Sequence, residues 1–174
     1  MDIGVINFLS RVSMVKKKLE KQLVALVFFI GVFGLSFIAS WVTKQGLDPW
    51  YTSILKPSFN PPSYVFGPVW TFLYIIIAWV GSYLWMMPKS QLRTQALVLW
   101  FIQMGLNFIW SFIFFGMHRI GVAFFELALL VLVVFSLIIY LRKIHKVAFY
   151  GFILYLIWLL YALVLNYFIF KLNG

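Results

Sequence analysis

Residues 121–141 read GVAFFELALLVLVVFSLIIYL, an apolar run that contains a single carboxylate, Glu126. About 20 apolar residues are needed for a helix to cross the ~30 Å hydrocarbon core of a bilayer. The run does not alternate between apolar and polar residues, which favours a helix over a strand of an outer-membrane barrel. This stretch therefore predicts a transmembrane helix.

Four more stretches of the chain have the same character. They cover residues 23–42, 66–87, 96–115 and 147–170. The chain has 174 residues, which is the length of one domain, and no internal repeat divides it. We therefore expect an all-α membrane protein in which residues 23–174 form one bundle of five transmembrane helices.

The composition excludes a soluble protein and a disordered one. Hydrophobic residues make up 64% of the chain, charged residues only 10%, and the mean hydropathy is +1.01. Soluble domains are close to half apolar and about a quarter charged, whereas disordered chains have low hydrophobicity. We expect a multi-pass integral membrane protein in contact with membrane lipid.

The sequence lacks the residue patterns of most catalytic sites. There is no cysteine, and the two histidines, His118 and His145, flank different apolar runs. No carboxylates are paired for acid–base catalysis, and no glycine-rich phosphate loop is present. The sequence predicts no metal site, no cofactor and no conventional active site. Glu126 is interpreted as a structural or interfacial group, with a proton relay as the alternative.

The net charge of +10 is assigned to membrane orientation and not to nucleic acid, because the basic residues lie between the apolar runs. Ten of the fourteen Lys and Arg residues fall in the N-terminal segment and in the connections after the second and fourth spans. These segments lie on one side of the membrane in a five-span topology. The N-terminus is predicted to be cytoplasmic if the protein resides in a bacterial-type inner membrane.

Residues 1–22 form a basic N-terminal tail that has two interpretations. Apolar side chains at several positions between 3 and 12 fit a short amphipathic helix in the membrane interface. The basic run of residues 16–18 equally fits an anchor at the start of the first span. Both interpretations stay open at this point.

Residues 43–65 form the one long connection. It contains four prolines, at positions 49, 57, 61 and 62, together with the aromatic residues Trp50, Tyr51 and Phe59. Proline fixes φ and biases the preceding residue toward an extended conformation, so the loop is predicted to be stiff. It is interpreted as a lid, with an aromatic belt at the membrane interface as the alternative.

Three spans each carry aromatic and polar residues on one helical face. The three faces consist of Trp70, Tyr74, Ile77 and Gly81; of Gln103, Asn107, Trp110, Ser111 and Phe114; and of Tyr155, Trp158, Ala162, Leu165 and Asn166. Faces that converge would enclose a cavity for a flat, largely apolar ligand with polar edges. The alternative is hydrogen-bonded packing between the helices.

Three motifs resemble the translocator protein or tryptophan-rich sensory protein (TspO/MBR) family. They are WYxxxLKPxxxPPxxxFGPVWTxLY at residues 50–74, QxxxNxxWSxxFF at residues 103–115, and WxxYAxxLN at residues 158–166. The resemblance extends from about residue 34 to residue 173. It implies a five-helix bundle that commonly forms homodimers and binds porphyrins of the haem pathway, sterols in some members, and isoquinoline or benzodiazepine drugs.

The resemblance also implies a ligand pocket between the helices and the first loop. Its lining, carried over by motif position, consists of Tyr51, Pro61, Trp70, Tyr74, Asn107, Trp110, Ser111, Trp158 and Ala162. We expect a membrane receptor or sensor for porphyrins. The alternatives are a porphyrin or sterol transporter, light-dependent porphyrin degradation with Trp70 and Trp158 as the participating indoles, and an assembly protein without a ligand.

Two departures from the family pattern accompany the resemblance. The family usually carries Pro-Tyr ahead of the tryptophan of the fifth span, where this chain has Leu154-Tyr155, so the proline that would kink this helix is absent. A dimer surface of closely spaced small residues is not evident on the third span, because Ala96 and Gly105 are nine residues apart.

Overall fold

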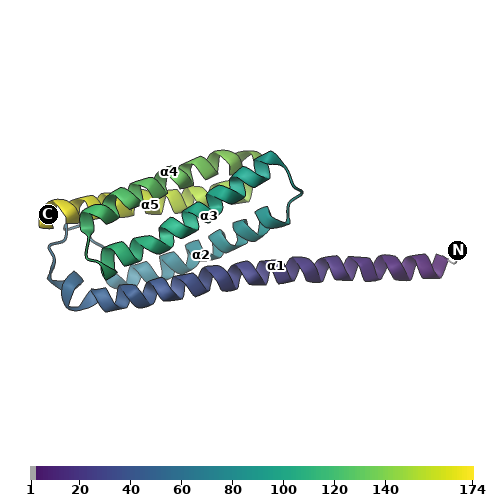
Figure 1. Ribbon diagram of the computed structural model, residues 1–174, viewed down its shortest axis with the longest axis horizontal. Coiled ribbons are helices and arrows are strands. Elements are labelled where there is room, and N and C mark those ends of the chain that lie inside the picture. The colour runs from purple at the N-terminus through teal and green to yellow at the C-terminus, as the bar shows by residue number, and fades with distance from the viewer. Residues whose placement is uncertain (1–2) are drawn as a thin grey trace.

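The computed structural model describes residues 3–174, with side chains from residue 11 onward, as a bundle of long helices (Figure 1). The helices are α1 (Ile3–Gly46), α2 (Ser63–Met86), α3 (Gln91–Ser111), α4 (Ile120–Ile144) and α5 (Lys146–Asn173), with π-helical turns η1 (Leu47–Tyr51) and η2 (Phe112–Gly116) after α1 and α3. All five helices are long and apolar enough to cross a membrane, and the described part contains no strand. The predicted all-α membrane bundle is confirmed.

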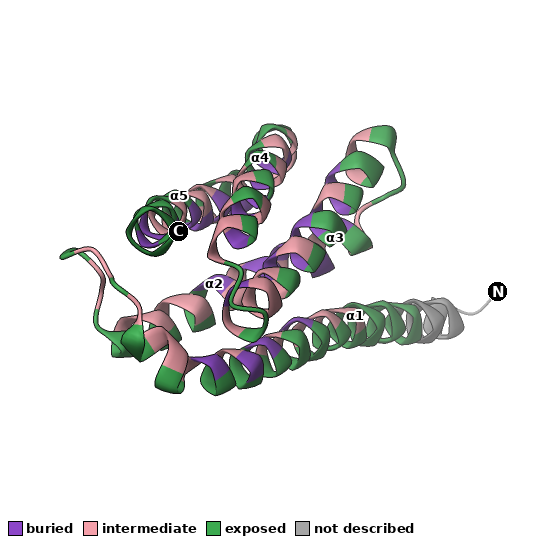
Figure 2. Ribbon diagram, turned by 60° about the vertical axis from the view of Figure 1, so that its left-hand side comes forward, coloured by how far each residue is buried: buried purple, intermediate pink, exposed green. Residues whose placement is uncertain are grey.

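The five helices form a closed ring. α1 packs against α2 and α3, α2 packs against α5, and α4 lies between α3 and α5. The inward faces are buried, whereas the outward faces are exposed and apolar (Figure 2), for example Phe125, Leu132 and Ile139 along α4. Lipid chains are the solvent that suits such faces.

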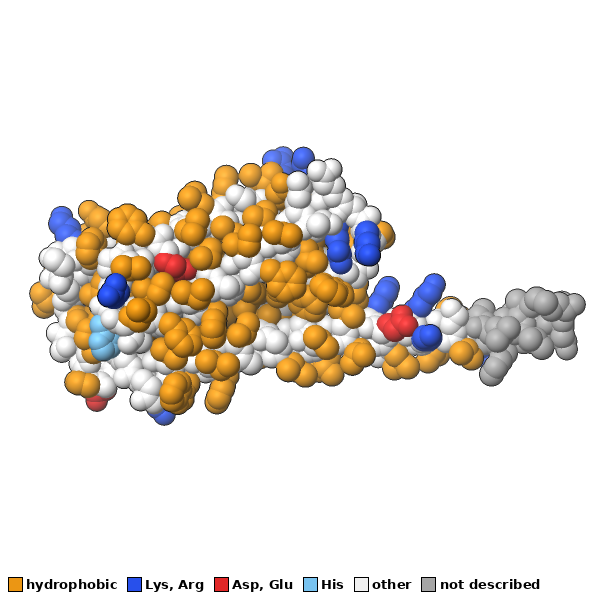
Figure 3. Space-filling model, in the orientation of Figure 1, with side chains coloured by type: hydrophobic (Ala, Val, Ile, Leu, Met, Phe, Trp, Pro, Cys, Tyr) orange, Lys and Arg blue, Asp and Glu red, His pale blue; other side chains and the backbone are white. Residues whose placement is uncertain are grey.

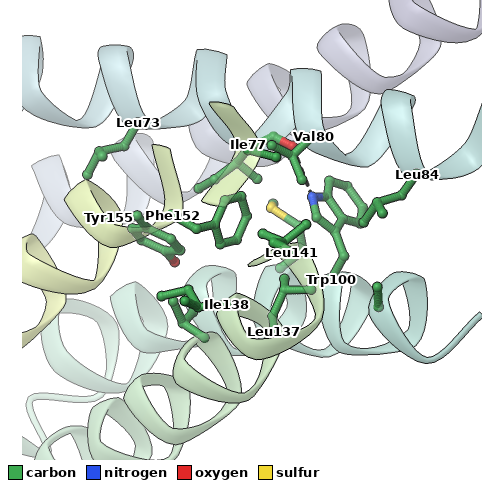
Figure 4. Close-up of a cluster of buried hydrophobic side chains, with 14 of the residues drawn as sticks. Leu73, Ile77, Val80, Leu84, Trp100, Leu137, Ile138, Leu141, Phe152 and Tyr155 are labelled. Atoms are coloured by element: carbon green, nitrogen blue, oxygen red, sulfur yellow. Dashed lines mark hydrogen bonds between the residues drawn. The ribbon is translucent and has the colours of Figure 1, made fainter. Parts of the chain in front are cut away.

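Apolar side chains fill the end of the bundle that lies away from the long connection (Figure 4). The cluster includes Ile77, Val80 and Leu84 of α2, Trp100 of α3, Leu137 and Leu141 of α4, and Phe152 of α5. Because lipid is as apolar as these side chains, helices in a membrane are held together by close packing and hydrogen bonds between them. This cluster is the packed core of the bundle.

Trp100 fits into this core because position 81 is a glycine. The Trp100 ring lies against Gly81, and a Cβ added there would overlap the indole ring. Trp100 Nε1 donates a hydrogen bond to the backbone oxygen of Ile77 at 2.9 Å. The indole N–H is therefore satisfied where no water is available to it.

Arg93 ties the start of α3 to the end of α2. Its Nε donates to the backbone oxygen of Leu84 at 2.9 Å, and its Nη2 donates to that of Trp85 at 2.7 Å. The backbone N–H of Arg93 donates to the side chain of Ser90, the N-cap of α3. The last carbonyls of a helix lack partners within the helix, so this arginine caps α2 and fixes the short turn.

The helices extend beyond the predicted spans. α1 is continuous from Ile3, so the described part of the basic tail is one helix with the first span and stands clear of the bundle (Figure 1). Lys and Glu are good helix formers, which explains why the helix does not end at the charged run. α2 begins at Ser63, directly after two prolines. The long connection is therefore shorter than 43–65, since α1 reaches Gly46 and η1 follows it.

Most Lys and Arg side chains lie at one end of the bundle and on the extension of α1, and a few lie at the opposite end (Figure 3). The connections α2–α3 and α4–α5 and the N-terminus all lie at the end that carries most of them (Figure 1). The arrangement agrees with an integral multi-pass protein. The cytoplasmic location of this end stays a prediction.

We predict that Gly81→Ala lowers the free energy of unfolding by about 1–3 kcal/mol, because the added methyl group displaces the Trp100 ring from a filled core. Thermal unfolding in detergent measures the effect. Gly105→Ala is the matched control, since its added Cβ meets no atom within 4 Å. Equal unfolding midpoints for the two variants would contradict the packing described for Trp100.

Candidate functional site

A cavity of about 430 Å³ lies in the half of the bundle nearest the long connection. α1, α2, α3 and α5 supply most of its walls, and Tyr51, Asn60 and Pro61 of the connection line it as well. The volume falls within the range of ligand pockets, which is roughly 300–1,000 Å³. The bundle therefore encloses a space large enough for a small organic molecule.

All nine residues that the sequence predicts for the pocket line this one cavity. They are Tyr51, Pro61, Trp70, Tyr74, Asn107, Trp110, Ser111, Trp158 and Ala162. They come from three helices and the connection, and residues up to 111 positions apart meet there. Their role in binding a ligand stays a prediction.

Aromatic rings form a corner on one side of the cavity. Trp70 stacks on Tyr74, with ring centroids 5.3 Å apart and an interplanar angle of 25°. Trp158 stands at 89° to Trp70 with a centroid distance of 6.4 Å, and Phe66 packs edge-on against Trp158 at 5.9 Å. Two perpendicular indoles offer one face and one edge to a flat aromatic ligand.

A chain of side-chain hydrogen bonds lies where the cavity meets the packed core. Tyr74 Oη donates to Asn107 Oδ1 at 3.1 Å, and Asn107 Nδ2 donates to Tyr155 Oη at 2.9 Å. Tyr155 Oη in turn donates to Gln103 Oε1 at 3.2 Å. Tyr155 and Gln103 are fully buried. The chain links α2, α3 and α5 and fixes the orientation of the Asn107 amide that faces the cavity.

Two residues of α5, Asn173 and Tyr161, hold the connection against this helix. Asn173 accepts a hydrogen bond from the backbone N–H of Leu55 and donates one to its backbone oxygen, both at 2.9 Å. Tyr161 Oη donates to the backbone oxygen of Phe59 at 2.9 Å. The connection therefore covers the cavity end in a fixed conformation, which fits the lid interpretation.

Trp50 belongs to the connection motif but does not line the cavity. Its ring stacks on His118, with centroids 4.2 Å apart and an interplanar angle of 16°. His118 lies between η2 and α4 and has a positive φ of 56°. Trp50 thus packs η1 onto the α3–α4 connection and positions its neighbour Tyr51.

Sequence reasoning missed the wall that α1 supplies. Ser36, Ser40 and Thr43 of α1 line the cavity, and so does Lys44. The three hydroxyl residues are spaced by four and three positions, so a polar stripe in an apolar helix was the signal that could have found them. Tyr155 lies on the predicted face of α5 but outside the predicted lining, and its role in the hydrogen-bond chain depends on the three-dimensional arrangement.

Glu126 does not line the cavity. It lies on α4, and both of its carboxylate oxygens are buried without a hydrogen-bond partner among the described residues. No group of three or more His, Asp or Glu side chains that could hold a metal occurs in the described part of the chain. The cavity presents aromatic faces, hydroxyls, amides and the side chain of Lys44 as its chemistry.

These features define a class: a five-helix membrane protein with an aromatic-lined cavity beneath a proline-rich loop. The chain belongs to the TspO/MBR family, whose model matches residues 24–172. It is 35% identical over 151 residues to tryptophan-rich protein TspO of Archaeoglobus fulgidus, covering 83% of this chain and 94% of the relative. The basic extension before residue 24 lies outside the family match.

Two further relatives are named translocator protein and tryptophan-rich sensory protein, the two names used for this family. The translocator protein of Homo sapiens is 33% identical over 141 residues, covering 79% of this chain and 82% of the relative. The tryptophan-rich sensory protein of Cereibacter sphaeroides is 33% identical over 128 residues, covering 72% and 78%. The resemblance inferred from the three motifs is confirmed.

We predict that Tyr155→Phe lowers the free energy of unfolding by about 1–2 kcal/mol, because it leaves the amides of Asn107 and Gln103 without their shared partner. Unfolding by a denaturing detergent, followed by circular dichroism, measures the effect. Tyr150→Phe is the matched control, since Tyr150 is exposed on the same helix. A decrease in the free energy of unfolding no larger than that of the control would contradict the proposed importance of this chain of hydrogen bonds.

We predict that Asn173→Ala accelerates hydrogen exchange at the amide of Leu55, because this amide loses its acceptor. Mass spectrometry of a peptide that covers residues 52–60 detects the change, and peptides from the middle of α4 should stay the same. Lys171→Ala is the control from the same helical turn. Unaltered exchange in Asn173→Ala would show that other contacts fix the connection.

Proposed function

We propose that the protein is a membrane receptor or sensor that binds porphyrins in the cavity beneath the connection. The observation that carries the proposal is the meeting of Trp70, Tyr74 and Trp158 on one side of a cavity of about 430 Å³. The motif resemblance implies the same ligand class, and the relatives named translocator protein and tryptophan-rich sensory protein fit a membrane sensor or translocator. Sterols and drug-like isoquinolines are further candidates for this space.

The walls of the cavity offer both aromatic faces and polar groups to a porphyrin. Its flat macrocycle offers a large aromatic face, and each aromatic pair contributes roughly 0.5–1.5 kcal/mol beyond the area that it buries. The lining also carries the Tyr74 hydroxyl and the Asn107 amide, which orient a ligand through its polar edge. A rigid ligand of this kind loses little conformational entropy on binding.

Light-dependent oxidation of the bound porphyrin is a second candidate function. The observation that favours it is the position of two oxidisable indoles, Trp70 and Trp158, with ring centroids 6.4 Å apart at the cavity. A porphyrin held beside them would act as photosensitiser, with dioxygen as the oxidant. This chemistry requires no acid–base pair, and product formed in the dark would contradict it.

We predict that protoporphyrin IX binds the purified protein saturably in the dark, and that Trp70→Phe and Trp158→Phe each weaken binding several-fold. A phenyl ring offers a smaller stacking surface than an indole. The shift of the porphyrin absorption band measures binding, so the loss of a fluorophore does not affect the reading.

Trp79→Phe is the control for this experiment. Trp79 packs against Tyr83 and His145 at the opposite end of the bundle, away from the cavity. Unsaturable binding would mean that the porphyrin partitions into the micelle. Equal affinity of wild type and both cavity variants would exclude this cavity as the porphyrin site.

A further inference from the structure

An open groove lies between α3 and α4, at the end of the bundle opposite the aromatic cavity. The first turns of α3 form one wall and the last turns of α4 form the other, so the groove opens beside the α2–α3 and α4–α5 connections (Figure 1). Its lining, which combines polar and apolar side chains, includes Gln91, Leu92, Gln95, Ile139, Tyr140 and Lys143. We call it the α3–α4 groove.

The groove lies at the level where the hydrocarbon core of a bilayer meets the lipid headgroups. α4 has 25 residues, so it is about 37 Å long, whereas the hydrocarbon core measures ~30 Å. Arg119 directly precedes α4, and Arg142 and Lys143 lie in its last turn, so charged residues mark both edges of the span. Lys143 therefore reaches the layer of the membrane that contains the phosphates.

The α3–α4 groove offers positive charge without a nearby carboxylate. Lys143 is exposed and is the single charged residue among those that line the groove. The sequence contains no Asp or Glu between Asp48 and Glu126 and none after Glu126, which lies at the opposite end of α4. Basic pockets between transmembrane helices attract acidic lipid headgroups. The charge of this groove therefore favours an anion.

Neutral polar groups accompany this charge. Gln91 and Gln95 are exposed and lie one turn apart on α3, and the partly exposed Tyr140 lies on α4. Amides and hydroxyls both donate and accept hydrogen bonds. These groups can donate to phosphate oxygens and accept from the hydroxyls of a glycerol headgroup. A phosphatidylglycerol headgroup carries both kinds of group.

An apolar surface continues from the groove along the outside of the bundle. Leu92 and Ile139 line the groove itself. Phe135 and Leu132 follow on the same face of α4, because they lie four and seven residues before Ile139, and they are 53% and 63% exposed. A phospholipid uses both the polar rim and this apolar surface, whereas a soluble anion or an acidic protein segment uses only the rim.

We propose that the α3–α4 groove is a binding site for an anionic glycerophospholipid of the phosphatidylglycerol type. Lys143 pairs with the phosphate, and the amides of Gln91 and Gln95 bind the other headgroup oxygens. The acyl chains lie along the apolar face of α4. Because the groove is separate from the aromatic cavity, this site does not depend on the proposed binding of porphyrins.

Three probes separate the contributions of charge and acyl chains. Native mass spectrometry of the whole chain in detergent gives the dissociation constant of the first bound lipid. Dioleoylphosphatidylglycerol is the anionic lipid, dioleoylphosphatidylcholine has a zwitterionic headgroup with the same chains, and glycerophosphoglycerol is the anionic headgroup without chains.

Two variants change the groove, and each has a matched control. Lys143→Gln removes the charge, and Ile139→Trp fills the groove without changing the charge. Lys146→Gln and Leu129→Trp make the same changes at exposed positions outside the groove. All four side chains are exposed, so equal thermal unfolding midpoints in lipid-free detergent are expected and show that the variants are folded.

The proposal expects wild type to bind phosphatidylglycerol at least about fivefold more tightly than phosphatidylcholine, and glycerophosphoglycerol far more weakly than either lipid. Lys143→Gln should weaken phosphatidylglycerol about fivefold, as expected for one lysine at an anionic membrane surface, and leave phosphatidylcholine unchanged. Ile139→Trp should weaken both lipids, and the two controls should change the affinities less than twofold.

Other results overturn the proposal. Equal losses in Lys143→Gln and Lys146→Gln would mean that the basic end attracts anionic lipid without a defined site. Equal affinity of wild type for both lipids would mean that the headgroup is not recognised. Binding of glycerophosphoglycerol as tight as that of the lipid would indicate a site for soluble phosphates. Tighter, Lys143-dependent binding of polyglutamate would identify an acidic protein segment as the occupant.

Discussion

The bundle depends on one constraint: a polar group inside a membrane must find its partner within the protein. The chain from Tyr74 through Asn107 and Tyr155 to Gln103 meets this constraint at the level where the packed core ends and the cavity begins. Because it joins α2, α3 and α5, the same bonds that pair both ends of the Asn107 amide also set the distance between three walls of the cavity. The stability of the bundle and the shape of the cavity therefore depend on the same residues.

The two halves of the bundle differ in how they fill their interior. In one half, Gly81 lets α2 accept the Trp100 ring, and apolar side chains fill the interior. In the other half, large rings stand along the walls, and the proline-rich connection, anchored by Asn173, covers the space between them. The cavity is the part of the interior that the side chains leave unfilled.

The sequence alone predicted the five spans and many of the residues that line the cavity. Apolar runs of sufficient length located all five spans, and helical periodicity placed Trp70, Asn107 and Trp158 on inward faces. Tyr51 and Pro61 came from the motif resemblance, since no periodicity extends through a loop. The order of helices around the ring could not be derived, because short connections fit several packing orders. The α1 wall was missed because Ser36 and Ser40 are small residues, and Phe33 on the same face is one of several phenylalanines in this apolar helix.

The position of a bound porphyrin tests the account most directly, and the tryptophans of the chain can report it. Brief illumination of protein with substoichiometric protoporphyrin IX in air generates oxidant at the porphyrin itself, and mass spectrometry then gives the oxidation of each tryptophan. The account predicts that Trp70 and Trp158 are oxidised before Trp41 and Trp85, whose side chains are exposed on the outer surface. Oxidation of Trp41 and Trp85 first would place the porphyrin outside the bundle and contradict the account.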